Sequence, residues 1–492
     1  MKFILVIDLG TSNTKASLFD ETGKTQFEAS VKTPTLFDSS RMEIDQDALW
    51  MGIRNLVASA RASVQMGDLI EAITVSSMAC TVIPVDREGR SLHLALSWLE
   101  KRPFEHYTLP FLKRFLDGFA IPDCGQYPLA MYPAFKIAWF HDTFPEKAGR
   151  VAWWINISDY IYAKMLGQTD RYFCDYSIAS RTMLFDDLKK QWNPQALKEF
   201  SIDAAQLPTP LPAGSILGTV GRELQELGLR SDTRIILGAH DHICASTGAA
   251  IRSTDRVLHS TGTSEVLTTG FDGTDLTRPP KKWVNVESSA IENENYLVAF
   301  CSSSGQIFQS FQATLNPSDI SENERLLRAY VTLADRSLFI PPVRSMQSGI
   351  TGSVSRLPGM FHTDDLWQSI YEGFAFECKR NLDRLFALTG KIPEKILSVG
   401  GQTRSPFLTQ LRSNIWGIPV ERLLEPNISS RGAFMIAAVA CGFYDDVMET
   451  ATHFYNQSEK DMFIPERQAF EAYDRFYRDH YLTEFPSGID TI

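Results

Sequence analysis

Short apolar runs alternate with amphipathic stretches along most of the chain. The apolar runs have the length of buried strands, and the amphipathic stretches repeat their apolar residues at helical spacing. The predicted strands are residues 3–7, 14–19, 73–76, 81–85 and 395–399, and the predicted helices are residues 52–65, 134–141, 159–166, 364–388, 406–415 and 432–440. Strands that alternate with helices are typical of an α/β protein, which is the fold class we predict.

The beginning and the middle of the chain share a pattern. An apolar run leads into Asp8-Leu9-Gly10-Thr11-Ser12 and a second strand, and a similar order recurs around Thr261-Gly262-Thr263-Ser264. A Gly-Thr-Ser tripeptide arises easily by chance, so the repeat alone is weak evidence. A true repeat predicts two similar halves, each presenting a turn toward a shared cleft. We place the division near residue 250, with domains over residues 1–250 and 251–492.

The first turn has the chemistry of a phosphate site. Glycine permits close approach to the backbone, and hydroxyl and main-chain N–H groups donate to phosphate oxygens. The candidate residues are Gly10, Thr11, Ser12, Thr14 and Lys15. Asp8, which can only accept hydrogen bonds when ionised, suits a hydrated Mg²⁺ at the end of the strand. A hairpin with polar turn residues and no ligand explains the segment equally well.

Two segments of the second half complete the candidate nucleotide site. The turn Gly262-Thr263-Ser264 offers the same donors as the first turn. Further on, a strand ends at Gly400-Gly401, and a helix begins with Ser405 as its N-cap. Two glycines let a flat ligand or a phosphate lie at the positive end of the helix. A plain turn and a plain strand–helix connection remain the alternatives for these segments.

Asp241 follows the apolar strand that ends at Gly238. Ligands bind at such strand ends in open α/β sheets, and a carboxylate there can accept a proton from a hydroxyl nucleophile. The alternative is that Asp241 caps the helix that follows. His240 and His242 have no third ligand at zinc-like spacing, which disfavours a metal site built on them.

Trp98, Glu100 and Arg102 alternate on one face if their segment is an extended strand. The indole ring of Trp98, the carboxylate acceptor of Glu100 and the two-pronged guanidinium donor of Arg102 would suit a ligand with many hydroxyl groups. A solvated strand with a surface ion pair is the alternative.

The charge balance and the cysteine content exclude several classes of protein. The 48 Lys and Arg against 59 Asp and Glu give a net charge of -11, which argues against nucleic acid as a partner. The seven cysteines show no Cys-x-x-Cys spacing, which disfavours a disulfide framework or structural zinc. The apolar run at the N-terminus is too short for a signal peptide, and no segment has the ~20 apolar residues that a membrane span needs. We therefore expect a cytoplasmic protein without a membrane partner.

The order of these segments resembles the FGGY family of carbohydrate kinases over nearly the whole chain. The segments that carry the resemblance are Asp8-x-Gly10-Thr11-Ser12, Trp98-x-Glu100-x-Arg102, Gly238-Ala239-His240-Asp241, Gly262-Thr263-Ser264, Gly400-Gly401 and residues 432–444. The stretch from Asp175 to Thr182 looks most like the gluconokinase and xylulokinase branch. The resemblance implies a two-domain ribonuclease H-like or actin-like ATPase fold with a nucleotide cleft between the domains.

The resemblance also implies roles for single residues. Asp241 matches the catalytic base, and Asp8 and Asp241 match the residues that organise Mg²⁺. The nucleotide positions are Gly10, Thr11, Ser12, Thr14, Lys15, Gly262, Thr263, Ser264, Gly305, Gly400, Gly401 and Ser405. The substrate positions are Met78, Cys80, Trp98, Glu100, Arg102, Asp241 and His242. Met78 and Cys80 stand where relatives carry polar sugar contacts, so the sugar itself is not identified.

We therefore predict ATP-dependent phosphorylation of a hydroxyl group on an open-chain sugar, sugar acid or polyol. Gluconate and a ketopentose such as xylulose are the favoured substrates, and ATP and Mg²⁺ are the cofactors. A sugar-independent ATPase of the same fold and a catalytically silent sugar sensor are the alternatives. A homodimer is one of the assemblies that the sequence allows.

Overall fold

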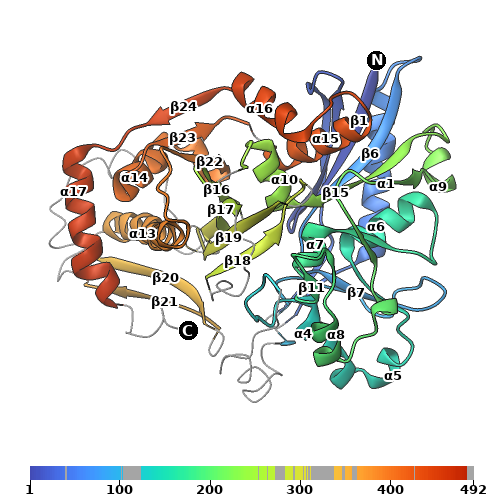
Figure 1. Ribbon diagram of the computed structural model, residues 1–492, viewed down its shortest axis with the longest axis horizontal. Helices are drawn as coiled ribbons and strands as arrows, with labels where there is room; N and C mark the ends of the chain where they lie inside the picture. Colours follow the sequence, from blue (N-terminus) through green and yellow to red (C-terminus); the bar gives the residue numbers. More distant parts are fainter. Residues whose placement is uncertain are drawn as a thin grey trace.

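A computed structural model describes residues 1–484 except 39–40, 101, 104–123, 253, 263, 272–282, 292–293, 303, 306, 309–310, 312–336, 346–348, 357–362 and 426. Thr263 of the second turn lies outside the described residues. The chain forms two lobes, with the first half of the sequence on one side and most of the second half on the other (Figure 1).

A mixed sheet is the centre of the first lobe. Its strand order is β14 (Ile216–Thr219), β15 (Arg234–His240), β6 (Leu69–Ser77), β1 (Lys2–Leu9), β2 (Asn13–Asp20) and β3 (Thr25–Lys32). Strands β1, β6 and β15 run parallel, and β1–β2–β3 is an antiparallel meander. The polar ends of β1, β6 and β15 therefore meet at one edge of the sheet.

Strand β1 is apolar from Phe3 to Ile7 because both faces of the sheet are covered. Its odd-numbered residues, Phe3, Leu5 and Ile7, pack into a core with α1 (Gln46–Ser63) and α6 (Ile157–Leu166). Its even-numbered residues Ile4 and Val6 pack into a second core with α10 (Asp241–Gly248) and α15 (Ile428–Ala440). This alternation follows from the two-residue period of a strand.

The second lobe repeats the strand arrangement of the first. Its sheet has the order β18 (Val284–Ser288), β19 (Asn295–Ser302), β17 (Glu265–Phe271), β16 (Val257–Thr261), β22 (Ile396–Gly400), β23 (Val420–Leu423) and β24 (Lys460–Phe463). Strand β16 pairs antiparallel with β17 and parallel with β22, as β1 pairs with β2 and β6. The repeat inferred from the sequence is present in the fold.

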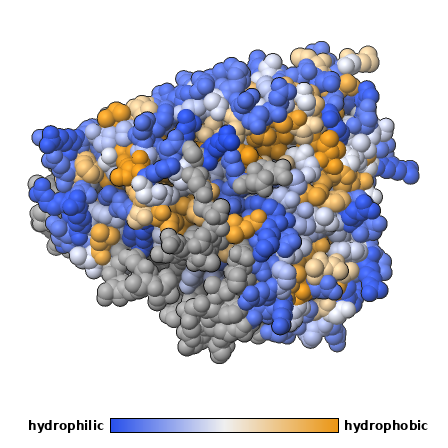
Figure 2. Space-filling view, viewed as in Figure 1, coloured by the Kyte–Doolittle hydropathy of each residue, from blue (hydrophilic) through white to orange (hydrophobic). Residues whose placement is uncertain are grey.

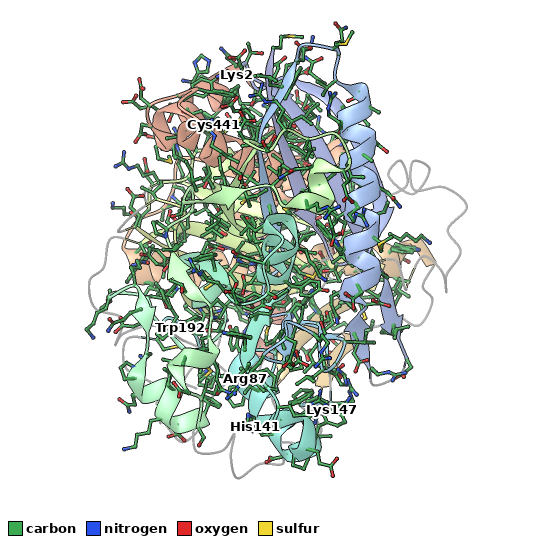
Figure 3. The ribbon with its side chains drawn as sticks, turned by 90° about the vertical axis from the view of Figure 1, so that its right-hand side faces the viewer. Lys2, Arg87, His141, Lys147, Trp192 and Cys441 are labelled. Atoms are coloured by element: carbon green, nitrogen blue, oxygen red, sulfur yellow. The ribbon has the colours of Figure 1, made fainter. Side chains whose placement is uncertain are left out.

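Helices α10 and α15 connect the lobes. Helix α15 belongs to the second half of the chain, yet it packs on α10 and against β1, β6 and β15 of the first lobe. Figure 3 shows Lys2 of β1 close to Cys441, which directly follows α15, and the Lys2 ammonium lies 6.0 Å from the ring centre of Phe443. The core that contains α10 and α15 is therefore shared by both halves of the sequence.

A smaller region extends the first lobe. A five-stranded sheet has the order β4 (Thr35–Phe37), β5 (Met42–Ile44), β8 (Ala95–Leu96), β7 (Val82–Val85) and β9 (Trp153–Asn156). The helices α4 (Pro133–Thr143), α7 (Tyr176–Ser180) and α8 (Pro194–Phe200) pack with β7, β8 and β9 around a separate core. Arg87, His141 and Trp192, labelled in Figure 3, mark this region.

The second lobe also carries helices on its sheet. They are α13 (Thr363–Thr389), α14 (Pro406–Trp416) and α17 (Arg467–Phe476). The surface in Figure 2 is mostly hydrophilic, with apolar residues in separate patches. Within the described ranges, no helix has the length and apolar character needed to cross a bilayer.

Candidate active site

The parallel strands of the first lobe bring two carboxylates together. Asp8 near the end of β1 is in register with Ser76 of β6, and Ser76 is in register with Ala239 of β15, two residues before Asp241. Burial, and next the negative charge of Asp241, raise the pKa of Asp8 to about 6. The strand register brings both carboxylates to the same edge of the sheet, and a divalent cation between them would relieve their repulsion.

Asp241 is the first residue of α10 and lies between two histidines. The strand before it continues to His240, so it ends two residues later than the sequence predicted, and the N-cap position belongs to His240 instead of Asp241. The Asp241 side chain is 31% exposed, and its Oδ1 lies 3.1 Å from His240 Nε2. Burial opposes ionisation, but the neighbouring His242 and His240, which both hydrogen-bond the carboxylate, lower the pKa of Asp241 to about 2.

His240 links Asp241 to the second lobe. Its Nδ1 lies 3.1 Å from Oε2 of Glu287, which is completely buried on β18. Burial lowers the pKa of this imidazole, but Asp241 and Glu287 outweigh the effect and raise it to about 10. Burial leaves His242 with a lowered pKa, so it is mainly neutral at neutral pH.

The donor set near Asp241 fits Mg²⁺ better than zinc. His240, Asp241 and His242 offer atoms within 4.8 Å of one another. Both ring nitrogens of His240 face carboxylates, however, and a doubly protonated ring cannot bind a metal. The carboxylates of Asp8 and Asp241 remain, and oxygen ligands are what Mg²⁺ prefers.

The first turn contacts one of the predicted substrate positions. The indole N–H of Trp98 donates to Thr11 Oγ1 at 2.9 Å. Gly10 and Thr11 are half-buried, and Ser12 is exposed, so this turn is accessible to a ligand. Thr14 is buried, with its hydroxyl oxygen 3.1 Å from that of Thr33, so it is occupied inside the lobe.

Lys15 contacts the other half of the chain. Its ammonium donates to Asn427 Oδ1 at 3.2 Å, and Asn427 immediately precedes α15. Lys15 also lies close enough to Asp8 for its charge to lower that pKa. The cation therefore lies between β2 and the start of α15, and near the candidate Mg²⁺ site.

The segment from Trp98 to Arg102 does not form the predicted strand. It makes a turn after β8, in which Glu100 N–H donates to the Ser97 carbonyl. Glu100 is completely buried, and its two oxygens accept from Arg102, which also pairs with Glu43. The segment is not extended, so the alternation on one strand face is absent, and the alternative of a surface ion pair is wrong too, because Glu100 is completely buried.

Met78 and Cys80 lie beside the carboxyl end of β6. Met78 N–H donates to the Leu9 carbonyl, next to the first turn, and its side chain is buried. Cys80 is buried with φ of 57°, a left-handed conformation that costs energy for a side chain. Its carbonyl accepts from Lys136 Nζ at 2.6 Å.

Three residues that sequence reasoning missed support this region. Lys136 is completely buried and also donates to the carbonyls of Ser97 and Leu96. Arg181 bonds Glu287, Gln126 and Tyr132. The sequence contained no local signal for Glu287 or Lys136, because each finds its partners far away in the chain.

The predicted nucleotide residues of the second lobe gather at one end of its sheet. Thr261, before the second turn, is in register with Gly400. Gly400 has φ of 103°, and a side chain there would lie 2.1 Å from the Thr261 carbonyl, so glycine is required. Ser405 caps α14 by accepting from Leu408 N–H at 3.2 Å, as the sequence predicted.

Gly305 lies next to the same end of the sheet. Its neighbour Ser304 accepts a hydrogen bond from Gln402 Nε2 at 2.9 Å. Gly262, Gly400 and Gly401 are exposed, and Ser264, Gly305 and Ser405 are half-buried. These positions thus form one accessible group on the second lobe, as a nucleotide would require.

Known proteins match the chain over almost its whole length. The model of the FGGY family of carbohydrate kinases, N-terminal domain, matches residues 3–248, and that of the C-terminal domain matches residues 257–441. A xylulose kinase from Bacillus subtilis is 24% identical over 502 residues, covering 97% of this chain and 95% of the relative.

Solved structures share the fold. A ligand-bound xylulose kinase from Lactobacillus acidophilus superposes with a TM-score of 0.88 at 21% identity, covering 100% of both chains. A gluconate kinase from the same organism has a TM-score of 0.86 at 22% identity, covering 98% of this chain and 97% of that one. The predicted two-domain actin-like ATPase fold is confirmed, and with both family domains matched, the chain belongs to the FGGY family of carbohydrate kinases.

Proposed function

We propose that this carbohydrate kinase transfers the γ-phosphoryl group of ATP to a hydroxyl group of a neutral open-chain sugar, with Asp241 as catalytic base. ATP is the donor that FGGY kinases use. The observation that carries the proposal is the juxtaposition of Asp8 and Asp241 at the strand ends beside the first turn. The catalytic role of Asp241 and the nucleotide contacts of both turns are parts of this proposal.

Phosphoryl transfer needs positioning and charge stabilisation more than strong proton abstraction. Mg²⁺ held by Asp8 and Asp241 would neutralise charge on the transferring phosphate. With its pKa near 2, Asp241 is ionised at any physiological pH and can accept the hydroxyl proton as the new P–O bond forms. His240 and the backbone N–H of His242 both contact Oδ1 of Asp241, which would leave the other carboxylate oxygen for the acceptor hydroxyl.

The charges around Asp241 favour a neutral sugar over a sugar acid. A substrate carboxylate needs a cation that is not already neutralised. Arg102 is paired with Glu100 and Glu43, and Arg181 with Glu287. Among the described residues of this region, no arginine is left unpaired for such a carboxylate. A ketopentose such as xylulose is therefore our first candidate, ahead of gluconate.

Asp241→Asn tests the assignment. Loss of the base should lower sugar-dependent ADP formation by about 10²–10⁴-fold while ADP binding, measured by calorimetry, is retained. Asp232→Asn is the matched control, because Asp232 is exposed just before the other end of β15 and pairs only with Arg230 in the described structure. If the Asp241→Asn protein turned over at the rate of the control, Asp241 would not be the catalytic base.

A coupled assay across xylulose, other ketopentoses, polyols and gluconate tests the substrate class. We expect the largest kcat/KM with a neutral substrate. A gluconate kcat/KM above all neutral sugars would contradict the charge argument. ADP release that no sugar accelerates would instead favour an ATPase, and sugar binding without ADP formation would favour a sensor.

A further inference from the structure

A buried polar network lies beneath the candidate nucleotide site of the second lobe. Glu265, the first residue of β17, directly follows the second turn and is completely buried. Its Oε1 accepts from His259 Nε2 at 2.7 Å and from Arg412 Nη2 at 3.1 Å. The Arg412 side chain is only 5% exposed and projects from α14, the helix that Ser405 caps. One ion pair therefore joins the turn to that helix.

The network continues into the other elements of the site. Arg412 also donates to Gln402 Oε1, and Gln402 in turn donates to Ser304, the neighbour of Gly305. On the opposite side, His259 Nδ1 accepts from Ser398 Oγ of β22 at 2.8 Å. Every segment that we assign to the nucleotide on this lobe is thus tied to the Glu265–Arg412 pair.

Stability alone does not account for such a pair. Burying two charges costs about as much as their attraction returns, so a packed apolar pair would stabilise the fold at least as well. An ion pair with fixed hydrogen bonds does, however, specify geometry. Here it specifies the relation between the phosphate turn, Ser304–Gly305 and the Gly400–Ser405 joint.

We propose that Glu265 and Arg412 are positioning residues for the nucleotide, and that their pair, extended through Gln402 to Ser304, preforms the nucleotide site of the second lobe. The proposal rests on the ATP-dependent kinase function argued above. Neither side chain needs to touch the nucleotide. A preformed site spares binding the cost of ordering three separate segments.

Three variants test the proposal by ADP calorimetry and steady-state kinetics. Glu265→Gln should raise the Kd of ADP and the KM for ATP about tenfold, with the sugar KM unchanged. Arg412→Met should have the larger effect, because it leaves the buried Glu265 carboxylate without its cation directly behind the phosphate turn. Adding Glu265→Gln to Arg412→Met should recover part of the loss, because it removes that anion.

The variant Gln402→Ala covers the case in which the buried substitutions prevent folding. Gln402 is only half-buried, and its removal cuts the arm to Ser304 without leaving a buried charge unpaired. It should also raise the Kd of ADP, by less than Glu265→Gln does.

The pair Arg380–Glu377 on α13 is the matched control. It is similarly buried, at 5% and 2% exposed, and Glu377 of this pair accepts a hydrogen bond from the Tyr481 hydroxyl. Arg380→Met should lower the melting temperature as Arg412→Met does, yet leave the Kd of ADP unchanged.

Three results would overturn the proposal. One is an unchanged Kd of ADP in folded Glu265→Gln, Arg412→Met and Gln402→Ala proteins. The second is an equal rise in Kd in Arg380→Met, which would make the effect a general loss of stability. The third is wild-type protein that does not bind ADP, which would also end the kinase function. Wild-type protein that binds ADP but phosphorylates no sugar would overturn the kinase function alone, and the Kd comparison would still decide the role of the pair.

Discussion

The Lys136 ammonium is buried among main-chain carbonyls and fixes two predicted substrate segments at once. It donates to the Cys80 carbonyl on one segment and to the Ser97 and Leu96 carbonyls on the other. A buried acceptor that loses its donor costs about 1–3 kcal/mol. Lys136→Met should therefore lower the free energy of unfolding by about 3 kcal/mol or more, and raise the KM for the sugar.

Urea unfolding and sugar-dependent kinetics measure these two effects. Lys147→Met is the control, because Lys147 is exposed, and it should change neither quantity. A wild-type sugar KM in a destabilised Lys136→Met protein would limit Lys136 to a structural role.

Glu265 predicts a pH dependence of stability. Burial opposes ionisation, but Arg412 and His259 lower the pKa of Glu265 to about 2 from an ordinary 4.5. A carboxylate with a lowered folded pKa contributes stability that is complete above its unfolded pKa and is lost as the pH falls toward the folded value. The difference in unfolding free energy between wild type and Glu265→Gln should thus be constant above pH ~5.5 and shrink toward pH 3.5. A difference that stays constant down to pH 3.5 in urea titrations would contradict this.

At the scale of elements, α10 and α15 pack closely enough that their facing glycines leave no room for a side chain. A side chain at Gly432 of α15 would lie 1.8 Å from the Cys244 carbonyl of α10, and one at Gly248 would lie 2.6 Å from the Ile428 carbonyl. Gly432→Ala therefore has to push the two helices apart. Overpacking of this kind costs about 1–3 kcal/mol, and we expect a lower melting temperature and a lower kcat because α10 carries Asp241.

Gly149→Ala is the matched control for this prediction. A side chain at Gly149 would make ordinary contacts, at 3.6 Å or more, in the region away from α10. Unchanged stability in Gly432→Ala would show that the helices separate freely.

At the scale of the whole molecule, the two halves of the sequence share a core. Phe434, Met435 and Ile436 of α15 lie in the same cluster as Ile4 and Val6 of β1. A fragment of residues 1–250 lacks α15, so one face of its sheet would be exposed to solvent. We expect the fragment to bind a hydrophobic dye and to unfold without a cooperative transition.

Co-expression with residues 251–492 should restore cooperative unfolding, because it returns α15 to the first lobe. A cooperative transition of residues 1–250 alone, followed by circular dichroism, would show that this domain is independent of α15.

Much of the fold could be predicted because its signals are local. The alternating burial of β1, the repeated strand–turn–strand pattern and the Ser405 cap all depend on neighbouring residues. Asp8 and Asp241 could be singled out because both lie near strand ends. The segment of Trp98 was predicted wrongly, since its shape depends on Glu43 and Lys136, which are distant in the sequence.

The sequence by itself determined the class of the fold, the position of the two turns and the residue types that phosphate and Mg²⁺ require. Spacing along a strand or helix carries that information. Only the tertiary structure decided which charges are neutralised: Glu287 with His240 and Arg181, and Glu265 with Arg412. The hydrogen-bond partner of a buried group depends on which distant segment of the chain packs against it. The pKa of the group depends on the charges and burial that this packing produces. Local spacing in the sequence contains neither kind of information.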